Sequence, residues 1–172
     1  MSVLIIAEHD NNILKSSTLN TISAALKLSD DIHLLILGSK IENLCKNTQS
    51  IHKVSKILKC DNEKLENFIP EIMAPIVSNI AKNYTHVLAP ASTFGKNLLP
   101  RVSALLDVTQ ISDVIEILSE NTFVRPIYAG NAISQVETNQ NINLLTIRPT
   151  AFDKCEESGG SASIEDIEFL NT

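Results

Sequence analysis

The sequence has no tryptophan, and only 4% of its 172 residues are aromatic. Proteins that bind single-stranded nucleic acid need several exposed aromatic side chains, on which bases stack, beside cationic residues. The formal net charge of −6 also opposes contact with a phosphate backbone. The composition therefore predicts a protein that does not bind nucleic acid.

Long apolar runs are also missing. No run approaches the roughly 20 residues that a membrane-spanning helix needs, and the N-terminus lacks the charged start and apolar block of a signal peptide. Cys45, Cys60 and Cys155 are odd in number, far apart and in no C-x-x-C pattern, which argues against a disulfide framework or a zinc site. We expect no membrane insertion and a reducing compartment, either the bacterial cytoplasm or, in a eukaryote, the mitochondrial matrix.

The motifs of catalysis and phosphate binding are absent as well. There is no G-x-G-x-x-G, Walker or G-x-S-x-G pattern, no catalytic Cys/His arrangement and no paired carboxylates at recognisable spacing. Residues 8–10, Glu-His-Asp, follow an apolar run and are either an acid/base or metal cluster or a solvated loop. The loop is favoured because the other histidines stand alone. We predict no catalytic residue and no metal site.

What the sequence does contain is an alternation of short apolar runs with helical stripes. Hydrophobic residues make up 44% of the chain and charged residues 20%, which is ordinary for a folded domain of about this length. Continuous apolar runs are typical of parallel strands covered on both faces. They occur at residues 3–7, 32–37 and 86–89. The pattern predicts a three-layer α/β/α fold with a Rossmann-like, mainly parallel sheet.

Two prolines fall inside the expected helices of this layer. Pro75 lies within the apolar stripe of residues 63–83, and Pro100 lies within that of residues 95–106. Because proline lacks an N–H and its ring clashes with the preceding turn, we expect both helices to be interrupted there.

After residue 107 the pattern changes to consecutive strands, expected at residues 111–118, 123–128, 132–137 and 143–147. They predict an antiparallel hairpin or meander in the C-terminal half, with one late strand returning to the main sheet. From residue 153 the composition becomes rich in Gly, Ser and Glu, so we expect a domain over residues 1–152 and a linker or tail over residues 153–172.

The turn after the run at residues 86–89 is a weak candidate for nucleotide binding. Ser92 and Thr93 are helix N-cap types, and Gly95 and Lys96 follow them. Open α/β sheets place ligands where a strand leads into a helix N-terminus. The turn offers a position for a ligand without identifying one.

Three arginines occupy apolar sequence surroundings, namely Arg101, Arg125 and Arg148. A buried guanidinium must find carboxylate or carbonyl partners. The nearest candidates are Asp107, Asp113 and Glu116. Internal pairing is favoured, which gives Arg101, Asp107, Asp113 and Arg148 a structural role; contacts across an interface and contacts with a ligand phosphate stay open.

The predicted hairpin at residues 122–133 is the first choice for a partner surface, because it carries much apolar area on a short ribbon. Its candidate interface residues are Phe123, Arg125, Pro126, Tyr128 and Asn131. The alternative interpretation is that these residues cover the main sheet.

The longest block, THVLAPASTFGKNLLPRVSALLDVTQISDVIEI, with TFVRPIYAGNAI, TIRPTAF and the opening LIIAEHDNNILKSSTLNTISAAL, resembles the N-terminal domain of the electron transfer flavoprotein alpha subunit. The resemblance implies a scaffold and interaction domain of a heterodimer with a beta subunit. It also implies FAD, bound mainly by a second domain whose motifs are absent here, and electron transfer from acyl-CoA and related flavin dehydrogenases to a quinone oxidoreductase. It implies an electron carrier rather than an enzyme. The alternative is a stand-alone module of Rossmann-like fold that binds an AMP-type nucleotide.

Overall fold

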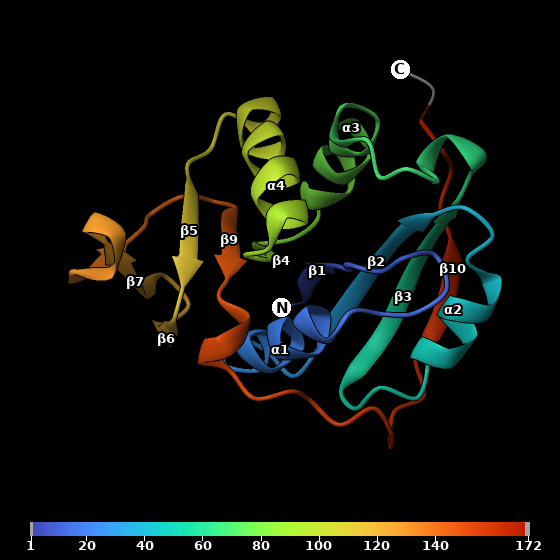
Figure 1. Cartoon of the computed structure of the whole chain (residues 1–172), viewed down its shortest axis with the longest axis horizontal. Helices are drawn as coiled ribbons and strands as arrows, with labels where there is room; N and C mark the ends of the chain where they lie inside the picture. Colours follow the sequence, from blue (N-terminus) through green and yellow to red (C-terminus); the bar gives the residue numbers. More distant parts are fainter. Residues whose placement is uncertain (1, 171–172) are drawn as a thin grey trace.

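A computed structural model describes residues 2–170 and has three layers, with a seven-stranded sheet between two pairs of helices (Figure 1). The strand order is β10-β3-β2-β1-β4-β9-β5, and every pair is parallel. The strands are β1 (Val3–Ile6), β2 (Ile32–Gly38), β3 (Val54–Asp61), β4 (His86–Pro90), β5 (Gln110–Val114), β9 (Asn143–Ile147) and β10 (Ser163–Asp166). The expected α/β/α fold with a mainly parallel sheet is confirmed.

The two helical layers bury opposite faces of the same strands. Ile5 packs in the cluster with α1 (Ser16–Ala25) and α2 (Glu42–Thr48), whereas Leu4 and Ile6 pack with α3 (Pro70–Ala81) and α4 (Thr93–Leu106). All four residues of β1 are 0% exposed. Alternate side chains of a strand point to opposite faces, so an apolar run without polar breaks suits a sheet covered on both sides.

The expected interruption of two helices is wrong. Helix α3 continues through Pro75 and α4 continues through Pro100. Both prolines lie toward the outside of their helices, where the carbonyls that they leave unpaired, those of Glu71 and Lys96, belong to exposed residues. Water can bond these carbonyls, and the buried stripe of each helix passes the proline without a break.

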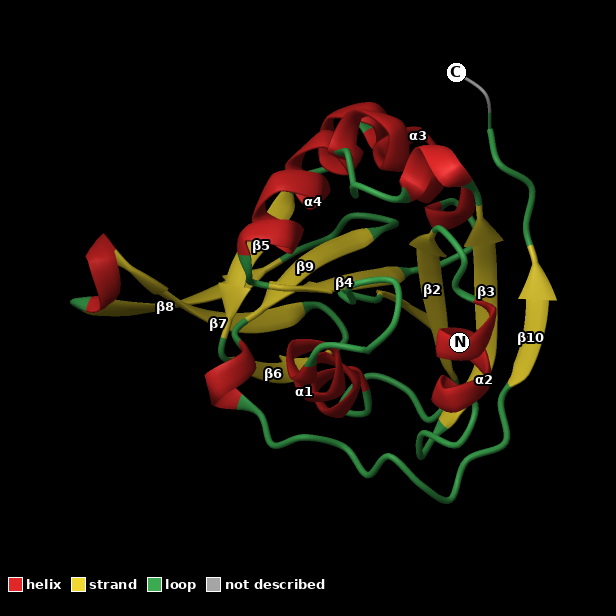
Figure 2. Cartoon of the chain, turned by 45° about the vertical axis from the view of Figure 1, so that its right-hand side comes forward, coloured by secondary structure: helices red, strands yellow, loops and turns green. Residues whose placement is uncertain are grey.

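A second sheet, antiparallel and three-stranded, projects from the main sheet (Figure 2). It consists of β6 (Glu116–Ser119), β7 (Thr122–Ile127) and β8 (Ala132–Glu137), so the expected meander is confirmed. The single strand expected at residues 111–118 is instead two strands in different sheets. Asp113 has a φ of 61° at an irregularity between β5 and β9, and this turns the chain out of the main sheet.

The segment after residue 152 has mostly exposed side chains, but its backbone is attached to the body of the domain at several points. It crosses the α1 and α2 side of the molecule and then forms β10, parallel to β3 (Figures 1 and 2). Gly160 N donates to Ser50 O at 2.8 Å, Ala162 N donates to Gln49 O at 3.0 Å, and Ala162 is 2% exposed. Within the expected linker or tail of residues 153–172, residues 163–166 are therefore a strand of the main sheet, while the role of the segment as a linker to a further domain stays a prediction.

The structure also contains the short helices η1 (Glu63–Leu65), η2 (Tyr128–Gly130) and η3 (Pro149–Ala151).

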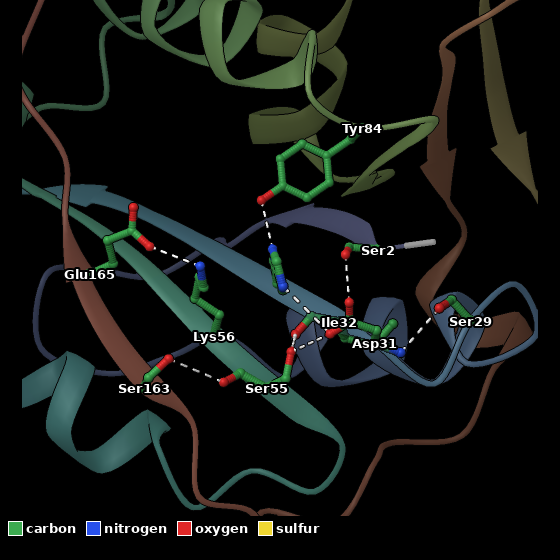
Figure 3. A network of polar contacts seen from close by, with 10 residues as sticks. Ser2, Ser29, Asp31, Ile32, Ser55, Lys56, Tyr84, Ser163 and Glu165 are labelled. Carbon is green, nitrogen blue, oxygen red and sulfur yellow. Dashed lines mark hydrogen bonds and ion pairs between the residues drawn. The ribbon is translucent and has the colours of Figure 1, made fainter.

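Polar side chains join the amino ends of the strands (Figure 3). Asp31 accepts hydrogen bonds from Ser2 Oγ at 2.5 Å and from Ser55 Oγ at 2.6 Å. Tyr84 Oη lies 2.7 Å from Nδ1 of His33, and burial lowers the pKa of His33. These contacts stabilise the amino edge of the sheet. In open α/β sheets, ligands usually bind at the opposite edge, where the carboxyl ends of the strands lie.

Candidate functional site

The carboxyl edge of the sheet has its switch point between β1 and β4. Helix α1 follows β1 onto one face, and α4 follows β4 onto the other. In open α/β sheets the crevice at such a point is the usual ligand site, because the chain leaves the two strands in opposite directions.

Aromatic rings of the chain itself pack together at this edge. The ring of His9, which follows β1, lies 5.1 Å from that of Phe68, and Phe68 lies 6.5 Å from Phe94 in the first turn of α4. His9 is 6% exposed, its Nδ1 accepts from Asn11 N at 3.0 Å, and burial lowers its pKa to about 4. His9 is therefore neutral at pH 7 and part of the packing.

The helix N-termini beside the crevice are also occupied. Ser92 Oγ accepts from Gly95 N at 3.5 Å, as expected of an N-cap. A Cβ at Gly95 would lie 1.9 Å from the carbonyl oxygen of Pro90, so the helix packs directly on the strand end. At α1, Ser17 Oγ donates to Glu8 Oε2 at 2.6 Å, so a carboxylate lies beside the first turn of this helix.

The four weak candidates of the turn do not form a phosphate cradle in this arrangement. Ser92 bonds its own helix, Gly95 is buried against Pro90, and Thr93 and Lys96 are exposed. Among residues 2–170 no group of three or more His, Cys, Asp or Glu side chains could hold a metal ion.

The hairpin of β7 and β8 is the other candidate. Phe123 is 0% exposed and belongs to the core, so its assignment to a partner surface is wrong, and Pro126 is buried too. Phe123 and Pro126 lie on opposite faces of β7, so both faces of this strand are covered near these residues. Tyr128 is 80% exposed and Asn131 is also exposed.

The tip of the hairpin has an unusual backbone. Tyr128, Ala129 and Gly130 have φ values of 49°, 53° and 91°. Left-handed geometry is costly for residues other than glycine and is frequent at functional sites. Ile133, next to the tip on β8, is 60% exposed. Ile133 was not among the interface residues expected from the sequence. It shares a face of β8 with the polar residues Gln135 and Glu137, and this alternation could have indicated its exposure.

The arginines lie apart from one another along the chain and have different partners. Arg148 pairs with Asp113, one of the three candidate carboxylates, through Nε–Oδ1 at 3.0 Å and Nη2–Oδ2 at 2.5 Å. Arg101 pairs instead with Glu71 at 2.5 Å. Asp107 ends α4 with a φ of 54°. Both pairings are internal.

The hairpin is fastened to the main body at its root. Arg125 Nε donates to Ser112 O at 2.8 Å, and His86 Nε2 donates to Glu120 O at 2.6 Å. Ile115 N donates to Val124 O at 2.8 Å. No sequence pattern predicted the role of His86, because its partner is a backbone carbonyl 34 residues away.

The model of the electron transfer flavoprotein domain family matches residues 3–170. The chain belongs to the electron transfer flavoprotein family. It is 47% identical to the electron transfer flavoprotein subunit alpha of Pseudomonas aeruginosa over 97% of this chain and 54% of that protein. It is 44% identical to the mitochondrial alpha subunit of Dictyostelium discoideum over 94% of this chain and 48% of that one, and 43% identical to that of Arabidopsis thaliana over 99% and 50%.

The chain spans about half the length of these curated relatives. Its similarity therefore assigns it to an alpha-subunit N-terminal domain of the electron transfer flavoprotein family, as the resemblance implied. Within the part of the chain that the structure describes, no helix is long and apolar enough to cross a bilayer.

Proposed function

We propose that this chain is the scaffold and subunit-interaction domain of an electron transfer flavoprotein alpha subunit. The observation that carries the proposal is the projecting hairpin, whose tip exposes Tyr128 and Ile133 beyond a tightly packed body (Figure 2). Exposed aromatic and aliphatic side chains that lie together are typical of protein interfaces.

The tip is suited to a partner surface for a second reason. Its left-handed residues, Tyr128 and Ala129, belong to η2, which connects the paired strands β7 and β8. A surface whose backbone is already fixed loses little conformational entropy on binding. The partner that we propose for this surface is the beta subunit, with Asn131 at the edge of the contact.

In the intact protein, the proposed role is to support a redox centre held elsewhere. FAD supplies the electron chemistry of such a carrier when it is bound. We place its binding site mainly in polypeptide beyond this chain, because aromatic packing and a carboxylate occupy the carboxyl edge here. The whole carrier would accept electrons from acyl-CoA and related flavin dehydrogenases and pass them to a quinone oxidoreductase. Its compartment would be the bacterial cytoplasm or the mitochondrial matrix.

The proposal is tested by binding to a purified beta subunit. The double variant Tyr128→Asp/Ile133→Asp puts two charges on the tip and should abolish co-purification. The control is Ile13→Asp, which changes a 67% exposed side chain in the loop before α1 and should bind as the unaltered chain does.

Two results would contradict the proposal. One is normal binding by the tip variant. The other is saturable thermal stabilisation of the unaltered chain by AMP together with no binding to the beta subunit, which would favour a stand-alone nucleotide-binding module.

A further inference from the structure

Within residues 2–170, Arg125 differs from Arg101 and Arg148 in having no acidic partner. Arg101 pairs with Glu71, and Arg148 pairs with Asp113. Arg125 makes one hydrogen bond within residues 2–170, from Nε to Ser112 O at 2.8 Å. A guanidinium has five N–H donors, so the four on its two terminal nitrogens have no partner in the described chain.

Asp113, next to Ser112, does not neutralise Arg125. Both of its carboxylate oxygens accept hydrogen bonds from Arg148. Its backbone is fixed as well, because its N–H donates to Oγ1 of the fully buried Thr146 at 2.8 Å. Arg125 and Arg148 are therefore bonded to the adjacent residues Ser112 and Asp113, and the carboxylate of Asp113 is already paired with Arg148.

The position of Arg125 on β7 places it between core and tip. Alternation puts it on the same face as Phe123, which is buried, and Ile127, which is half-buried. Ser134 is its cross-strand neighbour. The exposed Tyr128 follows only three residues later, so a partner that covers the tip can also cover the free edge of this guanidinium.

We propose that Arg125 receives a carboxylate of the beta subunit, from an Asp or Glu side chain that approaches the root of the hairpin. The inference rests on the proposed function, since it identifies the chemistry of that partner at that surface. The bond to Ser112 O fixes Nε and leaves the terminal nitrogens free for a paired contact, the geometry in which arginine recognises carboxylates. Arginine and tyrosine are also enriched among the interface residues that contribute most to the binding free energy.

The test measures association of the full chain with a purified beta subunit at low and at high salt. Arg125→Gln should raise the Kd by roughly 10- to 100-fold at low salt, because the partner carboxylate is left unpaired. It should also reduce the salt dependence of the association rate. Arg125→Lys keeps the charge but loses the planar fork, so its effect should be intermediate. Circular dichroism and thermal unfolding check that each variant is folded.

The matched control is Lys82→Gln, which removes one positive charge from an exposed side chain after α3. It should leave the Kd unchanged. Equal weakening by Lys82→Gln and Arg125→Gln would assign the effect to net charge and overturn the inference. Unchanged binding by a folded Arg125→Gln would overturn it as well, while leaving the proposed function intact. Failure of the unaltered chain to bind any beta subunit would instead refute the proposed function itself.

A charge reversal completes the test. Arg125→Glu should abolish binding, and replacement of one acidic residue of the beta subunit by Arg should restore it. If a scan of all acidic residues of the beta subunit finds no such rescue, the carboxylate contact is refuted.

Discussion

Gly160 lies in the segment that leads from η3 to the edge strand β10, and its replacement by alanine tests whether this segment is part of the fold. A Cβ at this position would lie 2.0 Å from the carbonyl oxygen of Ile51 and 3.1 Å from that of Ser50. Both are backbone atoms, so the segment itself must move. Its movement disturbs the hydrogen bonds of Gly160 N to Ser50 O and of Ala162 N to Gln49 O.

The expected loss of stability follows from these contacts. Overpacking of this kind costs about 1–3 kcal/mol, and each weakened hydrogen bond contributes about 1 kcal/mol. Because the segment can partly detach to relieve the clash, we expect Gly160→Ala to lower the free energy of unfolding by about 2 kcal/mol. For a chain of this size that corresponds to a fall in Tm of roughly 4–8 °C.

Urea unfolding followed by circular dichroism measures this change, with Ser158→Ala as the control at an exposed neighbour. The control should stay within about 0.5 kcal/mol of the unaltered chain. If Gly160→Ala is as stable as Ser158→Ala, the segment is a solvated linker and the attachment described for it is wrong.

Two further predictions concern the core and the crevice. Phe123→Ala should lower the unfolding free energy by about 3–5 kcal/mol because the ring is fully buried, whereas Tyr128→Ala should change it by less than about 0.5 kcal/mol; equal effects in urea unfolding would contradict the placement of the hairpin. Burial lowers the pKa of His9 from 6.5 to about 4, so the unfolded state takes up its proton first as the pH falls. The stability from His9 is therefore complete above pH 6.5 and is lost toward pH 4, by about 2 kcal/mol between pH 7 and pH 5. His9→Gln should flatten that part of the pH dependence, and an unchanged slope would show that His9 is not buried as a neutral ring.

The main sheet could be predicted from the sequence because its signal is local. Each inner strand is a short apolar run, and the long block around Ser92 carries the family resemblance. The errors arose where distant contacts decide the structure. Pro75 and Pro100 are tolerated because the carbonyls they leave unpaired belong to exposed residues, and the segment from residue 153 is ordered by the edge of β3 and by backbone carbonyls near Ser50.

The candidate site was only partly predictable for the same reason. The sequence shows that Phe123 and Tyr128 belong to one hairpin, but the twist and docking of that hairpin decide that one ring is buried and the other exposed. Asp113 was among the carboxylates expected to pair with an arginine, although the sequence did not show which arginine, and the bond of Arg125 to a backbone carbonyl leaves no trace in the sequence. Backbone partners carry no residue type and cannot be recognised from a pattern.

The measurement that tests the account most directly is the flavin content of this chain prepared alone, and then with a beta subunit, after incubation with excess FAD and removal of the unbound flavin. We predict that the chain alone is colourless and retains no FAD, and that it still binds the beta subunit through the hairpin. A yellow preparation of the chain alone, with about one tightly bound FAD per molecule, would contradict the claim that the redox centre lies in other polypeptide.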